Sequence, residues 1–161
     1  MKKIKILSLL AFVIVFTSCL NRTDGEEDMD VASEGSLTAK VDGVDYASLK
    51  TTVSAVFNNG VAAIQGSNSE GDYIRINIIN YTGIGSYKTG DLIANPNSVT
   101  YGKVAGNAAW VSTFNFGDGT IEVTGDNDTT ITGTFTFTGI NSSDNNSTKI
   151  LTEGKFSAPK N

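Results

Sequence analysis

The sequence contains no histidine, one cysteine and two prolines in 161 residues. The absence of histidine removes the commonest general base and a usual zinc ligand, and with them Ser-His-Asp and Cys-His catalysis. The single cysteine has no partner for an internal disulfide, so the fold must be stabilised by core packing. Hydrolysis by two carboxylates is the main enzymatic route that these absences leave open.

Basic residues are also few, with 12 lysines and arginines against 17 acidic residues and a net charge of −5. Beyond residue 35 the only arginine is Arg75. Proteins that bind phosphate backbones cluster lysine and arginine on one face. We therefore expect no nucleic-acid partner.

No apolar run is long enough for a membrane-spanning helix, which needs about 20 residues. The run from Ile6 to Phe16 is interrupted only by Ser8 and follows three lysines at positions 2, 3 and 5. A charged start followed by a short apolar segment is typical of a secretory leader. We predict a signal peptide over residues 1–18.

The residues at the end of this leader are Phe16-Thr17-Ser18-Cys19. They resemble the lipobox of bacterial lipoproteins, although Phe16 replaces the usual leucine. The resemblance implies that the Cys19 thiol takes a diacylglyceryl group, that cleavage precedes Cys19, and that the new amino terminus is acylated. Several acyl chains together hold a protein firmly on its membrane. A buried structural thiol is the alternative, but a cysteine directly after a leader has little core around it.

Residues 19–35 are polar and rich in acidic side chains, so we predict a disordered acidic tether. The stretch resembles the surface-export signal of Bacteroidota lipoproteins, and a plain solvated linker explains it equally well. The expected location is the outer membrane, lipid-anchored, on its periplasmic or surface-exposed face. Cleavage leaves nine of the 12 basic residues and a net charge of −8.

From Ser36 onward, apolar and polar residues alternate with a period of two, which indicates strands with one buried face. Asp42-Gly43 is a tight-turn dipeptide in the first hairpin. Strands at Tyr73–Asn80, Thr130–Thr138 and Lys149–Ser157 are the clearest. We predict one all-β domain over 36–161, an antiparallel β-sandwich or small open barrel of about 8–10 strands.

Four short motifs in this domain occur together and resemble a family of uncharacterised Bacteroidota lipoproteins of about this length. The motifs are Thr38-Ala39-Lys40-Val41-Asp42-Gly43, Gly85-Ser86-Tyr87, Gly133-Thr134-Phe135-Thr136-Phe137 and Thr152-Glu153-Gly154-Lys155-Phe156. The resemblance spans essentially the whole domain and implies an all-β fold. It implies no activity and supplies no catalytic residues.

Aromatic residues are the first candidates for a binding site. Trp110 is the sole tryptophan, and Tyr101 is the tyrosine that we pair with it as a candidate for stacking on a sugar ring. Tyr73, Tyr81 and Tyr87 are nearby in sequence and could share an exposed face. A lone tryptophan is, however, more often part of a core.

Acidic and hydroxyl residues in turns are the second group of candidates. Asp118, Asp126 and Asp128 are weak calcium candidates, because their spacing fits no known calcium loop and turn formation explains them better. Asp128-Thr129-Thr130 resembles the O-glycosylation acceptor of Bacteroidota, with Thr129 as the modified residue. We expect no cofactor.

Glu122 and Glu153 are the acids that a carboxylate-based glycan hydrolase would use, although solvated strand carboxylates explain them more simply. We therefore expect a non-enzymatic, membrane-anchored lipoprotein that acts as a cell-envelope or surface binding module. Its ligand would be a glycan, a small apolar molecule or an envelope protein. The alternatives are a structural envelope lipoprotein without a small ligand and the hydrolase.

Overall fold

The computed structural model describes residues 35–161. The predicted leader, Cys19 and the tether up to residue 34 lie outside these residues. The described chain forms eleven strands and one short 3-10 helix, and none of its helices is long and apolar enough to cross a membrane. The predicted all-β class is confirmed.

The strands are β1 (Ser36–Val41), β2 (Val44–Ala47), β3 (Ser54–Asn58), β4 (Val61–Ser67), β5 (Tyr73–Ile79), β6 (Gly85–Thr89), β7 (Ser98–Lys103), β8 (Ala108–Thr113), β9 (Asp118–Asp126), β10 (Thr130–Asn141) and β11 (Ser147–Pro159). The 3-10 helix η1 (Lys50–Thr52) links β2 to β3. Eleven strands slightly exceed the 8–10 expected. β2 and β6 are short edge strands of four and five residues.

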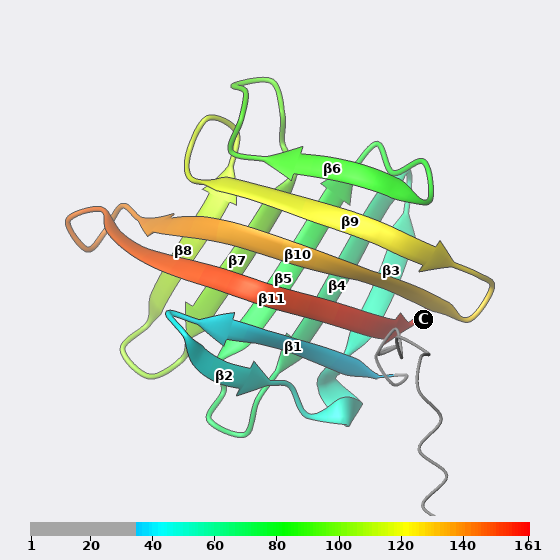
Figure 1. Cartoon of the computed structure of the whole chain (residues 1–161), viewed down its shortest axis with the longest axis horizontal. Helices are drawn as coiled ribbons and strands as arrows, with labels where there is room; N and C mark the ends of the chain where they lie inside the picture. Colours follow the sequence, from blue (N-terminus) through cyan, green and yellow to red (C-terminus); the bar gives the residue numbers. More distant parts are fainter. Residues whose placement is uncertain (1–34) are drawn as a thin grey trace, which may run out of the picture.

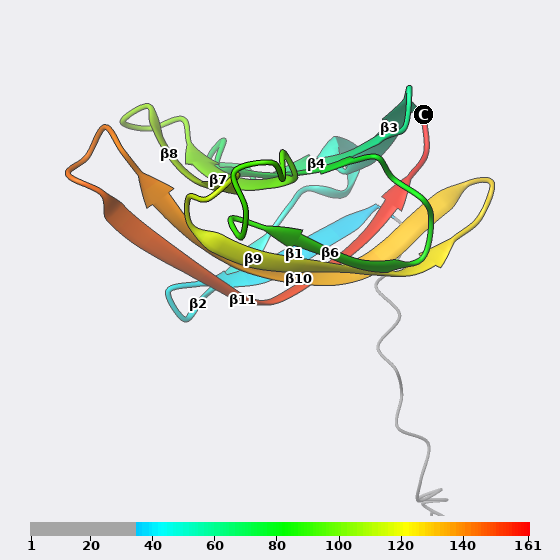
Figure 2. The same ribbon diagram turned by 90° about the horizontal axis from the view of Figure 1, so that it is seen from above.

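All eleven strands belong to one antiparallel sheet that curls into two layers. In Figure 1, β6, β9, β10, β11, β1 and β2 form a front layer, and β8, β7, β5, β4 and β3 cross behind it. The layers join on one side where Ile140 of β10 pairs with Val111 of β8, and on the other where Lys160 bridges to Ala55 of β3. Figure 2 shows the resulting half-barrel, which lies between the predicted sandwich and barrel.

The core lies between the two layers and is built from the inward side of each strand. Ile74, Ile76 and Ile78 of β5 are fully buried, as the alternation predicts. Burying one such side chain contributes about 1.5–3 kcal/mol. From the front layer, Phe135 and Phe137 of β10 face them, while the threonines of β10 lie on the opposite side of the strand.

Two glycines allow aromatic rings to lie over the backbone inside the front layer. Gly133 of β10 pairs with Phe156 of β11, and Phe135 pairs with Gly154 in the same ladder. A Cβ added to Gly133 would lie 2.5 Å from Cζ of Phe156 and would overlap the carbonyl oxygen of Glu122. Glycine at these positions therefore lets the rings fill the space above the neighbouring strand.

A β-bulge interrupts β11 at Glu153. Between the pairs Thr38↔Lys155 and Lys40↔Thr152, β11 contains one residue more than β1. Glu153 takes this extra place with a φ of 53°, a left-handed conformation that is uncommon for residues with a Cβ. Strict alternation cannot reveal such an extra residue, so the sequence predicts a regular strand over Lys149–Ser157.

Candidate functional site

The outer face of the back layer carries the residues that alternate with its buried isoleucines. Tyr73, Arg75 and Asn77 of β5 are on the opposite side of the strand from Ile74 and Ile76. Arg75 pairs with Gln65 of β4 on one side and with Thr100 of β7 on the other. Because β5 is the central strand of this layer, these polar side chains lie in the middle of the face.

Tyr73 lies across the neighbouring strand rather than standing upright. It pairs with Gly102 of β7, and a Cβ added to Gly102 would overlap the Tyr73 ring. The ring therefore covers the glycine, and the Tyr73 side chain remains partly exposed. The Arg75 guanidinium carbon is 5.8 Å from the centroid of the Tyr73 ring. A flat aromatic ring with an adjacent cation is thereby presented on the sheet surface.

Tyr73 and Arg75 line a shallow groove of about 780 Å³, which we call the outer-face groove. Its wall continues from β5 to η1, β3 and the loop after β7. The main side chains are Lys50, Thr52, Ser54, Gln65, Ser67, Tyr73, Arg75 and Val104. The groove thus combines an aromatic ring with amide, hydroxyl and cationic groups, which are the groups that bind a polar ring-shaped ligand.

Tyr73 is not among the residues that the sequence predicts for stacking, where it is only a neighbour of Trp110 and Tyr101. The signal was present, because Tyr73 has the same parity as the outward-facing Arg75. The pairing with Gly102 was not visible, since it depends on which strands become neighbours.

Trp110 and Tyr101, the predicted stacking residues, are brought together by adjacent strands β8 and β7. Their exposed fractions are 7% and 4%, and the two rings stack on each other with centroids 5.9 Å apart. Trp110 Nε1 donates a hydrogen bond to Ser147 Oγ at 3.0 Å. Stacking of these rings on a ligand stays a prediction, whereas their contact with each other is part of the core.

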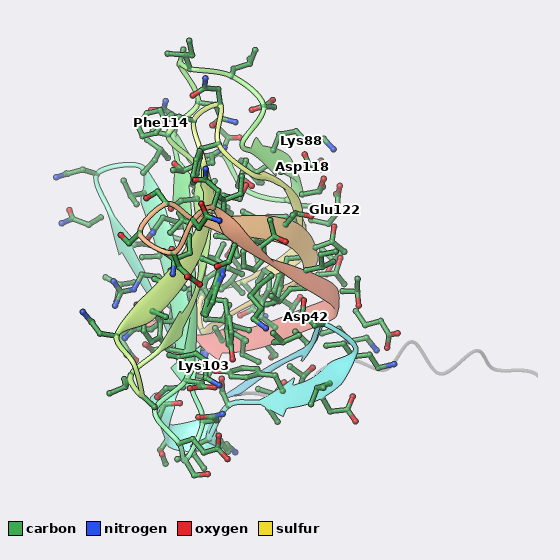
Figure 3. The ribbon with its side chains drawn as sticks, turned by 90° about the vertical axis from the view of Figure 1, so that its left-hand side faces the viewer. Asp42, Lys88, Lys103, Phe114, Asp118 and Glu122 are labelled. Atoms are coloured by element: carbon green, nitrogen blue, oxygen red, sulfur yellow. The ribbon has the colours of Figure 1, made fainter. Side chains whose placement is uncertain are left out.

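Tyr101 also lines a smaller cleft of about 360 Å³ beside the β1–β2 hairpin. Its hydroxyl donates to the buried Asp72 carboxylate at 2.9 Å, and Lys103 Nζ is 3.5 Å from the same oxygen. Burial and the Asp72 contact raise the pKa of Tyr101. Lys103, which lines this cleft, is labelled in the lower half of Figure 3. The contacts of Asp72 connect the loop before β5 to β7.

The three calcium candidates have different surroundings. Asp126 accepts a hydrogen bond from Tyr81 at 2.9 Å and forms an ion pair with Lys160. Asp118 and Asp128 are exposed, and Figure 3 shows Asp118 near the upper end of the front layer. Over residues 35–161, no group of three or more acidic, histidine or cysteine side chains is arranged to hold a metal ion.

The stabilising contribution of Asp126 should depend on pH, which makes it testable. Burial raises the pKa of Asp126, but hydrogen bonds from Lys160 and Tyr81 outweigh it and hold that pKa below its usual value. Its stabilising contribution is therefore present above the unfolded-state pKa of about 4 and is lost as the pH falls through the folded-state pKa. We expect Asp126→Asn to lower the free energy of unfolding by about 1–2 kcal/mol at pH 7.

Denaturant unfolding at pH 7 and at about pH 2.5 measures this effect, and the gap to the parent should shrink at the lower pH. Asp128→Asn is the matched control, because Asp128 lies in the same turn region and forms no hydrogen bond or ion pair among residues 35–161. An equal loss in both variants would contradict the assignment.

Thr129 occupies the turn between β9 and β10 and is exposed. Its hydroxyl donates to Asn127 Oδ1 at 3.1 Å, and the same oxygen accepts the backbone N–H groups of Thr129 and Thr130. This is an Asx-type turn, in which a side chain replaces a backbone acceptor. The position is accessible to a modifying enzyme, and O-glycosylation of Thr129 stays a prediction.

Glu122 and Glu153 line one shallow groove of about 470 Å³ on the outer face of the front layer. Glu122 belongs to β9 and is labelled toward the right of Figure 3. Glu153 forms a 2.9 Å ion pair with Lys40, and its side chain is 65% exposed. The hydrolase alternative required two acids on one cleft and meets that geometric condition, but the acids lie on an open sheet surface.

Comparison with known proteins places this architecture in a family. Residues 33–158 match the family described as a domain of unknown function, DUF6252. No curated protein and no solved structure matches the chain. The match covers every strand described above except the last residue of β11. The chain belongs to the DUF6252 family.

Proposed function

We propose that this protein is a lipoprotein anchored in the outer membrane through lipids on Cys19, and that its β domain is a binding module for glycans. The leader, the Thr17-Ser18-Cys19 motif and the acidic segment after it support the anchoring. The resemblance to uncharacterised Bacteroidota lipoproteins supports the same location. A binding role agrees with the absence of histidine from the sequence.

The observation that carries the glycan assignment is the Tyr73 ring lying over Gly102 in the outer-face groove. Sugar rings present apolar C–H groups on their faces, and these pack on flat aromatic side chains. Their hydroxyl groups need hydrogen-bond partners at the edge of that contact. Gln65 and Arg75, which pair across β4 and β5 next to Tyr73, supply an acceptor and donors there.

Removing the ring is expected to weaken glycan binding at least about tenfold, because stacking is then lost while the polar groups remain. The test compares Tyr73→Ala with the parent by calorimetry against a panel of oligosaccharides. Tyr73→Phe keeps the ring and is the matched control, so it should retain most of the affinity. Equal binding by Tyr73→Ala and the parent would contradict the site.

A structural envelope lipoprotein without a small ligand is the main alternative, and absence of binding to every oligosaccharide would favour it. The hydrolase alternative rests on Glu122 and Glu153 sharing one groove. Release of reducing ends from a bound glycan, lost in both Glu122→Gln and Glu153→Gln, is the result that would favour catalysis over binding.

A further inference from the structure

Most lysines in the described part of the chain already have a partner. The ion pairs are Lys40 with Glu153, Lys103 with Asp72, Lys149 with Asp42 and Lys160 with Asp126. Lys155 is also engaged, and Lys88 donates to the Thr120 hydroxyl at 2.7 Å. Lys50 and Arg75 form no ion pair with any residue of 35–161, and neither does Lys88, which lies on β6 outside the outer-face groove.

Lys50 and Arg75 both line the outer-face groove, and no aspartate or glutamate side chain lines it. The chain as a whole is acidic, with a net charge of −5. A local excess of positive charge in an acidic protein attracts anions to that place and not to its surroundings. The groove therefore combines the stacking ring with two cations that form no ion pair with the described residues.

Arg75 is well suited to bind an anion beside the ring. Its only hydrogen bond to a described side chain reaches Gln65 Oε1 at 3.5 Å, which is the long limit for such a bond. Most of its guanidinium donors thus remain available. The planar guanidinium group matches the two oxygens of a carboxylate or sulfate. Its carbon is 5.8 Å from the Tyr73 ring centroid, so a sugar stacked on Tyr73 has its substituents next to Arg75.

We propose that the outer-face groove selects acidic glycans, with a sugar ring on Tyr73 and its carboxylate or sulfate bound by Arg75 and Lys50. This inference rests on the proposed function of the groove as a glycan site. It adds the class of ligand: sugars that carry an anionic group, such as uronic acids or sulfated sugars.

The test measures binding of matched oligosaccharide pairs to residues 19–161 with Cys19→Ser, a soluble form that keeps every described residue. Each pair consists of an acidic oligosaccharide and its neutral form, made by methyl esterification of the carboxylates or by removal of sulfate. At least one acidic member should bind tenfold or more tightly than its neutral form. The preference should shrink when the ionic strength is raised from about 0.05 M to about 0.5 M.

Arg75→Gln and Lys50→Gln should each weaken binding of the acidic member more than binding of the neutral member, and so reduce the preference. Tyr73→Ala should weaken binding of both members. Lys88→Gln is the matched control, because Lys88 is an exposed lysine on β6 of the front layer, outside the groove. It should leave both affinities unchanged.

The outcomes separate this inference from the function on which it rests. Equal binding of acidic and neutral members, with loss of both in Tyr73→Ala, overturns the acidic preference and leaves the glycan site intact. A preference that survives in Arg75→Gln and Lys50→Gln overturns the role of these two cations. Absence of binding to every pair overturns both the inference and the proposed glycan function.

Discussion

Replacing Gly133 with alanine is expected to lower the free energy of unfolding by about 3 kcal/mol, at the upper end for an overpacked core. The new methyl group would overlap the Glu122 carbonyl oxygen and lie 2.5 Å from the Phe156 ring. The backbone of β9 cannot move without breaking its ladder with β10, so the strain is not relieved by a side-chain rotation. Chemical denaturation at pH 7 measures the loss.

Gly102→Ala is the matched control, since it also places a methyl group against an aromatic ring. The atoms it meets are the far end of the Tyr73 side chain on the outer face, which can swing toward solvent. We expect a loss of about 1 kcal/mol or less together with weaker glycan binding, because Tyr73 no longer lies flat. If Gly133→Ala is as stable as Gly102→Ala, the core packing described for β9, β10 and β11 is wrong.

Replacing Cys19 with alanine is expected to abolish lipid labelling completely and to leave the chain as an uncleaved precursor. The thiol is the acyl acceptor in the predicted motif, and no second cysteine exists to replace it. Without several acyl chains, we expect the proposed membrane attachment to be lost. Metabolic labelling with a radioactive fatty acid, together with electrophoretic mobility, measures both changes.

Phe16→Leu is the control for this experiment, because it changes the least usual residue of the motif toward the common one and leaves the thiol in place. It should be labelled and cleaved at least as well as the parent. Normal lipid labelling of Cys19→Ala would contradict the lipoprotein assignment and would leave the β domain without an explained route to the membrane.

The alternation of apolar and polar residues alone predicts which side chains of a strand are buried and which lie on the opposite face. Ile74, Ile76 and Ile78 are buried as predicted, and the threonines of β10 lie on the face opposite Phe135 and Phe137. Period-two alternation predicts such faces because successive side chains of a strand point in opposite directions. It failed at Glu153, where one extra residue shifts the register of β11 against both of its neighbours.

The residues of the candidate site depend on which strands pair, and the alternation of apolar and polar residues cannot predict that pairing. Trp110 and Tyr101 were selected for their chemistry, yet their neighbours enclose them between the layers. Tyr73 points outward by its parity in β5, but its ring lies flat because the strand beside it offers Gly102 instead of a bulky side chain. Lys50 joins Arg75 only because η1 lies at the edge of the same face.

Local order along the chain was thus sufficient for the all-β class and for the buried side of most strands, and it is the basis on which the leader and the lipidated cysteine stay predictions. These properties depend on near neighbours in the sequence, such as alternating side chains or small residues before a thiol. The half-barrel, the bulge and the groove that joins Tyr73, Arg75 and Lys50 required the folded chain. Each arises from pairing between residues far apart in sequence, where the gain from burial and hydrogen bonding selects one register among many with similar alternation.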